Sequence, residues 1–368
     1  MRFTCERDEI SKALQAVSGV VASKGIHPVY ESVRIVASDA GLELLATDLE
    51  IGMRYRIAAG DGLRVEGKGT AVVPAQRLAS ICKELPKGQV SLAWNADARE
   101  CVITAGRGRF RLQGQSPEDF PEIPAVGDGS GLVLETAVLR NLVRLTSFAA
   151  ARERMRFALN GVLLRVEGET IECVATDGRR LARATAPLRN DGKSEFSAIV
   201  PTKGLQQLER TIGEGDVEVR LAVGNNHLSA STSRAAVTSR LVEGSFPNYR
   251  DVIPQTCQRK AVIPREPLAS ALRRAALVTS REAQSVKLKF DGDSLTVSAQ
   301  SAEGSAEETV SCEQTGGADM IGFNPEFLLE ALGVLSGESV AFEWNDRKSP
   351  GKLTEGSYTY VVMPVSIE

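Results

Sequence analysis

The sequence predicts an α+β fold made of three tandem repeats, each with two helices packed on antiparallel sheets. Three observations carry this prediction. Short segments recur at a nearly constant spacing, proline-containing segments separate the repeats, and helical and strand patterns follow the same order in each repeat. A chain of 368 residues is long enough for two or three domains, and a period near 125 residues is far longer than a solenoid unit.

The repeats are visible as matching short segments. ATDLE at 46–50 and ATDGRRLA at 175–182 begin 129 residues apart, and VPAQRL at 73–78 and VPTKGL at 200–205 begin 127 residues apart. A third copy follows at a shift of 124, which aligns Val162 with Val286, Ala175 with Ala299 and Pro201 with Pro325.

The joints between repeats contain proline. FPEIP at 120–124 ends the first repeat and FPNYRDVIP at 246–254 ends the second. Proline fixes φ and disfavours helix in the preceding residue, so both segments are expected to be extended connectors. The predicted domains are therefore residues 1–125, 126–254 and 255–368.

Each repeat begins with a helical segment and carries a second helix after a proline in its middle. In the first segment Ile10, Leu14, Val17 and Val21 recur at helical spacing. Proline is tolerated at a helix start. The expected helices lie within residues 8–24, 74–87, 135–154, 201–212, 264–281 and 324–335. Alternating apolar and polar residues predict strands such as 90–94, 100–105 and 109–114.

Composition indicates an ordinary globular protein that stays inside the cell. Hydrophobic residues make up 42% and charged residues 25%, and no apolar run has the length of a membrane span. The N-terminus MRFTCERDEI has no apolar signal core, so no export is expected. The six cysteines form no CxxC pair and are expected to be reduced packing residues in the cytoplasm.

Charge is distributed unevenly although the net charge is only −3. The six helical segments together carry +6, so the remainder carries −9. The charged faces of these helices are either ordinary solvated surface or parts of one basic surface that binds a polyanion. The helices carry few aromatic residues, which disfavours base stacking and favours contact with a phosphate backbone.

The motifs of an active site are missing from the sequence. His27 and His227 have no metal-ligand spacing, and GLRVEGKG at 62–69 lacks the hydroxyl residue that a P-loop needs after its lysine. Asp177 aligns with Asp48 and Ser301, so the repeat tolerates loss of its carboxylate. We interpret Asp177 as a turn residue. No enzyme activity, cofactor or metal is expected.

These segments together resemble one family. ATDGRRLA, SFPNYRDVIP, GFNPEF, the ending YVVMPVSIE and the start MRFTCERDEI are similar to the bacterial DNA polymerase III β subunit, the sliding clamp, from end to end. The resemblance implies three DNA-clamp domains, and a head-to-tail homodimer that forms a ring around duplex DNA without reading its sequence. It implies a nucleoid-associated processivity factor that tethers the replicative polymerase.

The resemblance assigns residues to three surfaces. The candidate DNA-facing residues are Lys12, Lys24, Arg140, Arg144, Arg152, Lys203, Arg210, Arg273 and Arg274. The candidate dimer interface joins the first domain to the partner's third domain through Arg107, Arg109, Phe110, Leu112, Leu277, Val278, Glu303, Glu307 and Glu308.

The third surface is a pocket for a short linear peptide from the polymerase III catalytic subunit, the clamp loader, other polymerases and repair proteins. It comprises Leu159, Thr176, Gly178, Arg179, Arg180, Leu181, Pro247, Val252, Asn324, Phe327, Val361, Met363, Pro364 and Val365. Asp251, Ala283 and the VSIE tail depart from the family's pattern, and leave the preferred peptide open.

Two other functions remain as alternatives at this point. A non-ring repeat protein that binds single-stranded nucleic acid needs exposed aromatic residues on strands, and only 5% of residues are aromatic. A hydrolase that uses Asp48 or Asp177 lacks a base, metal or nucleophile.

Overall fold

The computed structural model describes residues 1–21, 27–60, 62–123, 131–152, 157–188, 195–212, 217–279 and 285–366. The chain forms two compact units. The first contains Met1–Ala137 and Lys203–Leu241, and the second contains Val138–Thr202 and Val242–Glu368. Both units therefore take residues from the predicted second repeat.

Within the described residues, α-helices form where the sequence predicts them, and each repeat contains two. They are α1 (Arg7–Ser18), α2 (Ala75–Glu84), α3 (Thr136–Thr146), α4 (Thr202–Thr211), α5 (Arg265–Ala276) and α6 (Pro325–Val334). The prediction extended the first helix face to Val21, but α1 ends at Ser18. Val20 and Val21 are buried beyond the helix.

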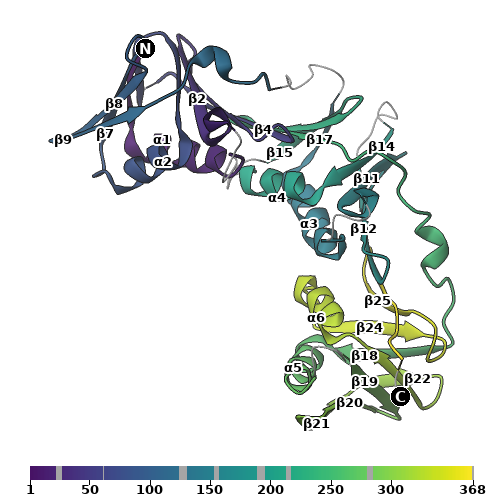
Figure 1. The fold of residues 1–368 in the computed structure, drawn as a ribbon. Helices are drawn as coiled ribbons and strands as arrows, with labels where there is room; N and C mark the ends of the chain where they lie inside the picture. The colour runs from purple at the N-terminus through teal and green to yellow at the C-terminus, as the bar shows by residue number, and fades with distance from the viewer. Residues whose placement is uncertain are drawn as a thin grey trace. The chain divides into compact units, whose positions relative to one another are not determined.

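The first unit contains two antiparallel sheets (Figure 1). The five-stranded sheet has the order β5 (Leu63–Gly67), β1 (Arg2–Glu6), β7 (Gln89–Asn95), β8 (Glu100–Ala105) and β9 (Gly108–Gln113). The eight-stranded sheet has the order β10 (Leu132–Glu135), β15 (Glu218–Val223), β16 (His227–Ser231), β17 (Ala235–Arg240), β4 (Ile51–Ala58), β3 (Gly41–Thr47), β2 (Ser32–Ser38) and β6 (Gly69–Pro74).

The second unit also contains two sheets. The nine-stranded sheet has the order β14 (Phe196–Pro201), β11 (Gly161–Glu167), β12 (Thr170–Thr176), β13 (Arg180–Pro187), β26 (Tyr358–Val362), β25 (Gly351–Glu355), β24 (Ser339–Trp344), β18 (Arg259–Pro264) and β22 (Glu313–Thr315). The four-stranded sheet has the order β21 (Gly304–Ser311), β20 (Ser294–Ser301), β19 (Val286–Asp291) and β23 (Asp319–Phe323).

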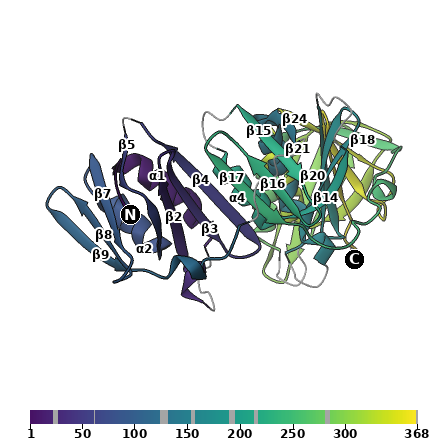
Figure 2. The same ribbon diagram turned by 90° about the horizontal axis from the view of Figure 1, so that it is seen from above.

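Successive repeats are joined by strand pairing. In the eight-stranded sheet β4 of the first repeat pairs with β17 of the second. In the nine-stranded sheet β13 of the second repeat pairs with β26 of the third. This pairing explains why the compact units do not follow the repeats. The terminal strand β9 lies beside β8 in Figure 2, and β21 ends the four-stranded sheet.

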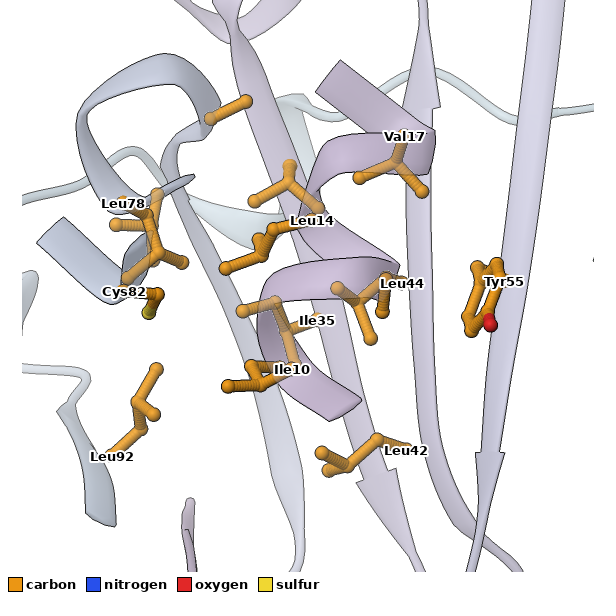
Figure 3. Close-up of a cluster of buried hydrophobic side chains, with 14 of the residues drawn as sticks. Ile10, Leu14, Val17, Ile35, Leu42, Leu44, Tyr55, Leu78, Cys82 and Leu92 are labelled. Atoms are coloured by element: carbon orange, nitrogen blue, oxygen red, sulfur yellow. The ribbon is translucent and has the colours of Figure 1, made fainter. Parts of the chain in front are cut away.

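The core of the first repeat lies between its helices and its sheets (Figure 3). Ile10, Leu14 and Val17 of α1 and Leu78 and Cys82 of α2 belong to one buried cluster. Side chains from both sheets complete the cluster, including Ile35, Leu42, Leu44, Tyr55 and Leu92. Burying apolar area of this kind stabilises the fold by about 25 cal/mol per Å². In the third repeat α5 and α6 lie side by side.

The cysteines are packing residues, as predicted. All six are free thiols, and all but Cys257 are buried. Burial raises the pKa of Cys82 and of Cys101 to about 12, so both thiols stay protonated at neutral pH. The segment GLRVEGKG forms β5 and the start of β6, so no helix follows it as a P-loop requires.

The connector after the second repeat differs from the extended segment predicted. Residues Arg250–Val252 form a 3₁₀ turn (η5). The anchor is Tyr249, which is buried and donates a hydrogen bond from its hydroxyl to the Glu172 carboxylate. Phe246 is only partly buried against the same cluster. The tyrosine can enter the interior because its polar end has a partner. The first connector lies partly outside the described residues.

Candidate functional site

A side-chain oxygen holds the turn at the corresponding place in each repeat. Asp48, Asp177 and Ser301 each accept the backbone N–H of the residue two positions later, at 3.0, 2.9 and 3.1 Å. Side-chain oxygens of Asp and Ser stabilise turns in this way. The interpretation of Asp177 as a turn residue is confirmed. Gly178 has φ 88°, a left-handed conformation that glycine adopts without strain.

Arg180, which follows the second turn, is the most enclosed cation of this region. Its side chain is 4% exposed and pairs with Asp177 at 3.1 Å. It also pairs with Glu330 of α6 and donates to the Phe148 carbonyl at 3.0 Å. The guanidinium carbon lies 4.4 Å from the ring centre of Phe327 and 5.5 Å from that of Phe148. Two carboxylates and two aromatic rings therefore surround the Arg180 guanidinium group.

This arrangement offsets the cost of burying a charge. Burial alone lowers the pKa of an arginine, but the hydrogen bond to Glu330 and the surrounding negative charges raise the pKa of Arg180 above its ordinary value. A buried cation with incomplete partners costs several kcal/mol. The contacts of Arg180 thus fix α6 of the third repeat against the β12–β13 turn of the second.

A cleft of about 660 Å³ opens beside Arg180. Four predicted peptide-pocket residues line it: Gly178, Arg179, Arg180 and Phe327. The other lining residues are Ala150, Ala151, Arg152, Asp177, Glu326 and Glu330. Most of these side chains are charged, so the cleft suits polar groups better than large apolar side chains.

An apolar surface continues from the same strands. Leu181 pairs with Val361 across β13 and β26, and both belong to a buried cluster with Tyr249. Two predicted pocket residues present large apolar side chains to solvent, since Val252 is 51% and Met363 44% exposed. The Met363 N–H donates to the Arg179 carbonyl at 2.8 Å, which holds the C-terminal segment along the turn.

The remaining predicted pocket residues lie in supporting positions. Leu159 and Thr176 are buried, and the Thr176 hydroxyl donates to the Arg180 carbonyl at 2.6 Å. Asn324 caps α6 by accepting the Glu326 N–H at 2.9 Å. Val365 donates its N–H to Gly322, Pro364 is partly buried and Pro247 is exposed.

Several predicted DNA-facing cations already have partners within the chain. Lys203 pairs with Asp48, and Arg152 with Glu330 at 2.8 Å. Arg144 donates to the Val334 carbonyl in the last turn of α6, where a cation stabilises a helix end. Arg273 approaches Glu266 at 3.9 Å.

Four further predicted DNA-facing residues differ in their exposure or lie outside the described residues. Lys12 on α1 and Arg210 on α4 are exposed, and neither makes an ion pair within the described part of the chain. Arg140 is half-buried on α3. Lys24 lies outside the described residues.

The predicted dimer residues lie at three places. Arg107, Arg109, Phe110 and Leu112 belong to β9 or the turn before it, and Phe110 is 40% exposed. Leu277 and Val278 follow α5, and Leu277 is 82% exposed. Glu303 precedes β21, where Glu307 and Glu308 lie.

Glu308 has a partner within its own chain. Arg274 donates to both carboxylate oxygens of Glu308, at 2.6 and 2.8 Å. This hydrogen bonding raises the pKa of Arg274 and lowers the pKa of Glu308. One residue predicted to face DNA and one predicted to face a second copy are thus paired with each other.

Sequence reasoning missed Phe148 and Glu330. Phe148 lies in the 3₁₀ turn η3 (Ser147–Ala149) that follows α3, and no sequence pattern marks that turn. Glu330 carries a signal, because it lies three residues after Phe327 on the same face of a predicted helix.

The described residues contain no group of three or more histidine, cysteine, aspartate and glutamate side chains arranged to hold a metal. None of the described helices has both the length and the hydropathy to cross a membrane. Repeats joined through their sheets, with a cleft lined by charged side chains, define a protein built from three similar domains.

Comparison with known proteins identifies its family. The N-terminal, central and C-terminal domain models of the DNA polymerase III beta subunit match residues 1–124, 133–248 and 250–366. The chain is 35% identical to the beta sliding clamp of Pseudomonas aeruginosa and 32% to that of Escherichia coli K12, each over the full length of both proteins. The chain belongs to the DNA polymerase III beta subunit family, the beta sliding clamps.

Solved structures agree with this assignment. The crystal structure of the Pseudomonas aeruginosa DNA polymerase III subunit beta has a TM-score of 0.93 at 34% identity. The DNA polymerase sliding clamp from Bacillus subtilis has a TM-score of 0.95 at 26% identity. Both comparisons cover all of both chains, and the three-domain clamp fold that the resemblance implies is confirmed.

The replacement Arg180→Lys tests the cation cluster. Lysine keeps the charge but cannot reach Asp177, Glu330 and the Phe148 carbonyl at once, so we expect a loss of about 2 kcal/mol in the free energy of unfolding. Chemical denaturation measures it. The matched control is Arg179→Lys at the exposed neighbour, expected to change stability by less than about 0.5 kcal/mol. Equal effects of both replacements would contradict the role given to Arg180.

Proposed function

We propose that this protein is a sliding clamp that encircles duplex DNA and tethers the DNA polymerase III catalytic subunit and other clamp-binding proteins. It carries no catalytic activity of its own and acts in the cytoplasm, at the nucleoid. Its three clamp domains are residues 1–125, 126–254 and 255–368. The proposal rests on the match to the family over the whole chain.

The observation that supports the proposed ring is the pattern in which strands join the sheets of successive repeats. β4 finds its partner in the next repeat, and so does β13. Their counterpart in the third repeat is β21, and the counterpart of β17 and β26 in the first repeat is β9. Both β21 and β9 are terminal strands. Pairing β21 with β9 of a second copy repeats the same joint and closes a head-to-tail homodimer.

The residues around these strands suit such a contact. Phe110 and Leu277 are exposed apolar side chains, and burying them between copies supplies an apolar centre. Arg107 and Arg109 on one copy and Glu303 and Glu307 on the other give that centre a rim of opposite charges.

The lysine and arginine side chains on the helices contact the phosphates of the DNA and do not read its base sequence. Because Lys203, Arg152 and Arg274 are already paired with carboxylates, their attraction to phosphate is reduced. Weak contacts of this kind permit sliding, and the closed ring retains the DNA. Among the exposed large hydrophobic side chains of the described residues, Phe110 is the one aromatic, which disfavours a single-strand binder that stacks bases.

Client peptides bind beside the β12–β13 turn. The exposed apolar side chains of Val252 and Met363 receive the apolar anchors of the peptide. Met363 can repack around different clients because its side chain is flexible. The polar cleft beside Arg180 receives the neighbouring peptide residues.

Release from cut DNA tests the ring. The protein is loaded on nicked circular DNA by a matching clamp loader, and the circle is then linearised. A topologically bound ring slides off the ends, so we expect the linear form to lose the protein and the uncut circle to keep it. Equal retention on the linear form would rule out topological binding.

The double replacement Met363→Ala/Pro364→Ala tests the pocket. Loss of an exposed apolar anchor is expected to weaken binding of a polymerase C-terminal peptide about tenfold, measured by fluorescence anisotropy. Dimerisation measured by sedimentation should not change, because the pocket lies on a different surface. Unchanged peptide affinity would show that the peptide binds elsewhere.

A further inference from the structure

The connector after the second repeat carries one of the exposed apolar side chains of the proposed peptide site. Val252 ends the turn η5 and is 51% exposed. Its backbone N–H donates to the Tyr249 carbonyl at 3.3 Å, and the N–H of Ile253 donates to the Arg250 carbonyl at 3.4 Å. Both distances exceed the usual range for such hydrogen bonds, so they hold the turn only weakly. The position of Val252 therefore depends on the side chains that anchor the connector.

The ring of Tyr249 provides an apolar anchor. Tyr249, Leu181 and Val361 belong to one buried cluster. Leu181 and Val361 pair across β13 and β26 and form the floor of the proposed peptide site. Phe246 and Ile253 pack against the same cluster from either side of the turn. Apolar contact has no preferred direction, so it keeps the ring on the floor without fixing where the turn lies.

The hydroxyl of Tyr249 adds a directional contact. It donates to the carboxylate of Glu172 on β12, whose side chain is 6% exposed. The other oxygen of this carboxylate accepts a hydrogen bond from Arg183 on β13, the strand paired with β12. Burial and the Glu172 carboxylate raise the pKa of Tyr249 above its ordinary value, so the hydroxyl keeps its proton at neutral pH. The sheet therefore holds the acceptor of this bond in place.

The other polar contacts of the connector are exposed. Arg250 pairs with Glu167 at 3.4 Å, and both side chains are more than half exposed. Arg165, which lies across the sheet from the buried carboxylate, pairs with the same Glu167 at 2.9 Å. Exposed pairs of this kind contribute little to stability. Asn248 donates to Asp251 within the connector, which does not tie it to the sheet. Tyrosine at 249 is thus the buried polar anchor among the side chains of residues 246–253.

We propose that Tyr249 and Glu172 are positioning residues for the client peptide. Their hydrogen bond holds the η5 turn, so that Val252 and the floor formed by Leu181 and Val361 are arranged before a peptide arrives. A site arranged in advance binds more tightly, because the peptide does not have to order the connector. Glu172 is buried and acts through the tyrosine. The inference rests on the proposed peptide site and assigns how that site keeps its shape.

The replacement Tyr249→Phe tests this role, because it removes the hydroxyl and keeps the ring in the apolar cluster. The turn is then anchored by undirected contacts. We expect the dissociation constant of a polymerase C-terminal peptide, measured by fluorescence anisotropy, to rise about fivefold. Amides of residues 246–253 should also exchange faster with solvent in the free variant than in the free parent chain.

Two matched variants separate positioning from a general loss of stability. Glu172→Gln keeps a side-chain oxygen that accepts the tyrosine hydroxyl, and Arg183, whose side chain is 32% exposed, can turn to water. Its peptide affinity should stay within about twofold of that of the parent chain. Val297→Ala removes buried apolar atoms from β20, in the other sheet of the same unit, and lowers stability there. Its peptide affinity should not change.

A loss of affinity of about threefold or more in Tyr249→Phe, absent from both matched variants, supports the proposal. A smaller loss in Tyr249→Phe overturns it, and so does an equal loss in Val297→Ala, which would mark a general effect of stability. An equal loss in Glu172→Gln overturns the role given to the hydrogen bond. A folded parent chain that does not bind the peptide contradicts the proposed peptide site itself, and with it this inference.

Discussion

Backbone pairing between strands of successive repeats is the interaction on which the rest of the structure depends. A sheet edge leaves N–H and C=O groups without partners, and the first and second repeats each resolve this at one side by pairing with the repeat that follows. The β4–β17 and β13–β26 ladders place the repeated turn beside the following repeat's second helix. The cleft beside Arg180 exists because of this placement.

The carboxylates at these joints also affect how strongly the helices attract DNA. Asp48 and Glu330 pair with cations that the family resemblance assigns to DNA contact. The same carboxylates therefore stabilise the joints and moderate the attraction of the helices for phosphate. A protein that must hold DNA and also move along it benefits from both effects.

The sequence was sufficient for the repeats, the six helices and the turn chemistry, because helical spacing and Asp-Gly turns are local signals. The sequence was insufficient to predict side-chain contacts between residues that come from distant segments of the chain. No local pattern joins Lys203 to Asp48, or Arg180 to Phe148 and Glu330. Alignment of the repeats placed Asp177 correctly as a turn residue, whereas the contacts of Arg180 and the anchor at Tyr249 required the folded chain.

Hydrogen exchange at the two terminal strands tests most directly whether this pairing continues between copies. If β21 pairs with β9 of a second copy, amides in residues 108–113 and 304–311 are protected at high protein concentration and lose protection together on dilution. Amides of β17 and β26, already paired within the chain, should stay protected throughout. Fast exchange of β9 and β21 at every concentration would contradict the account.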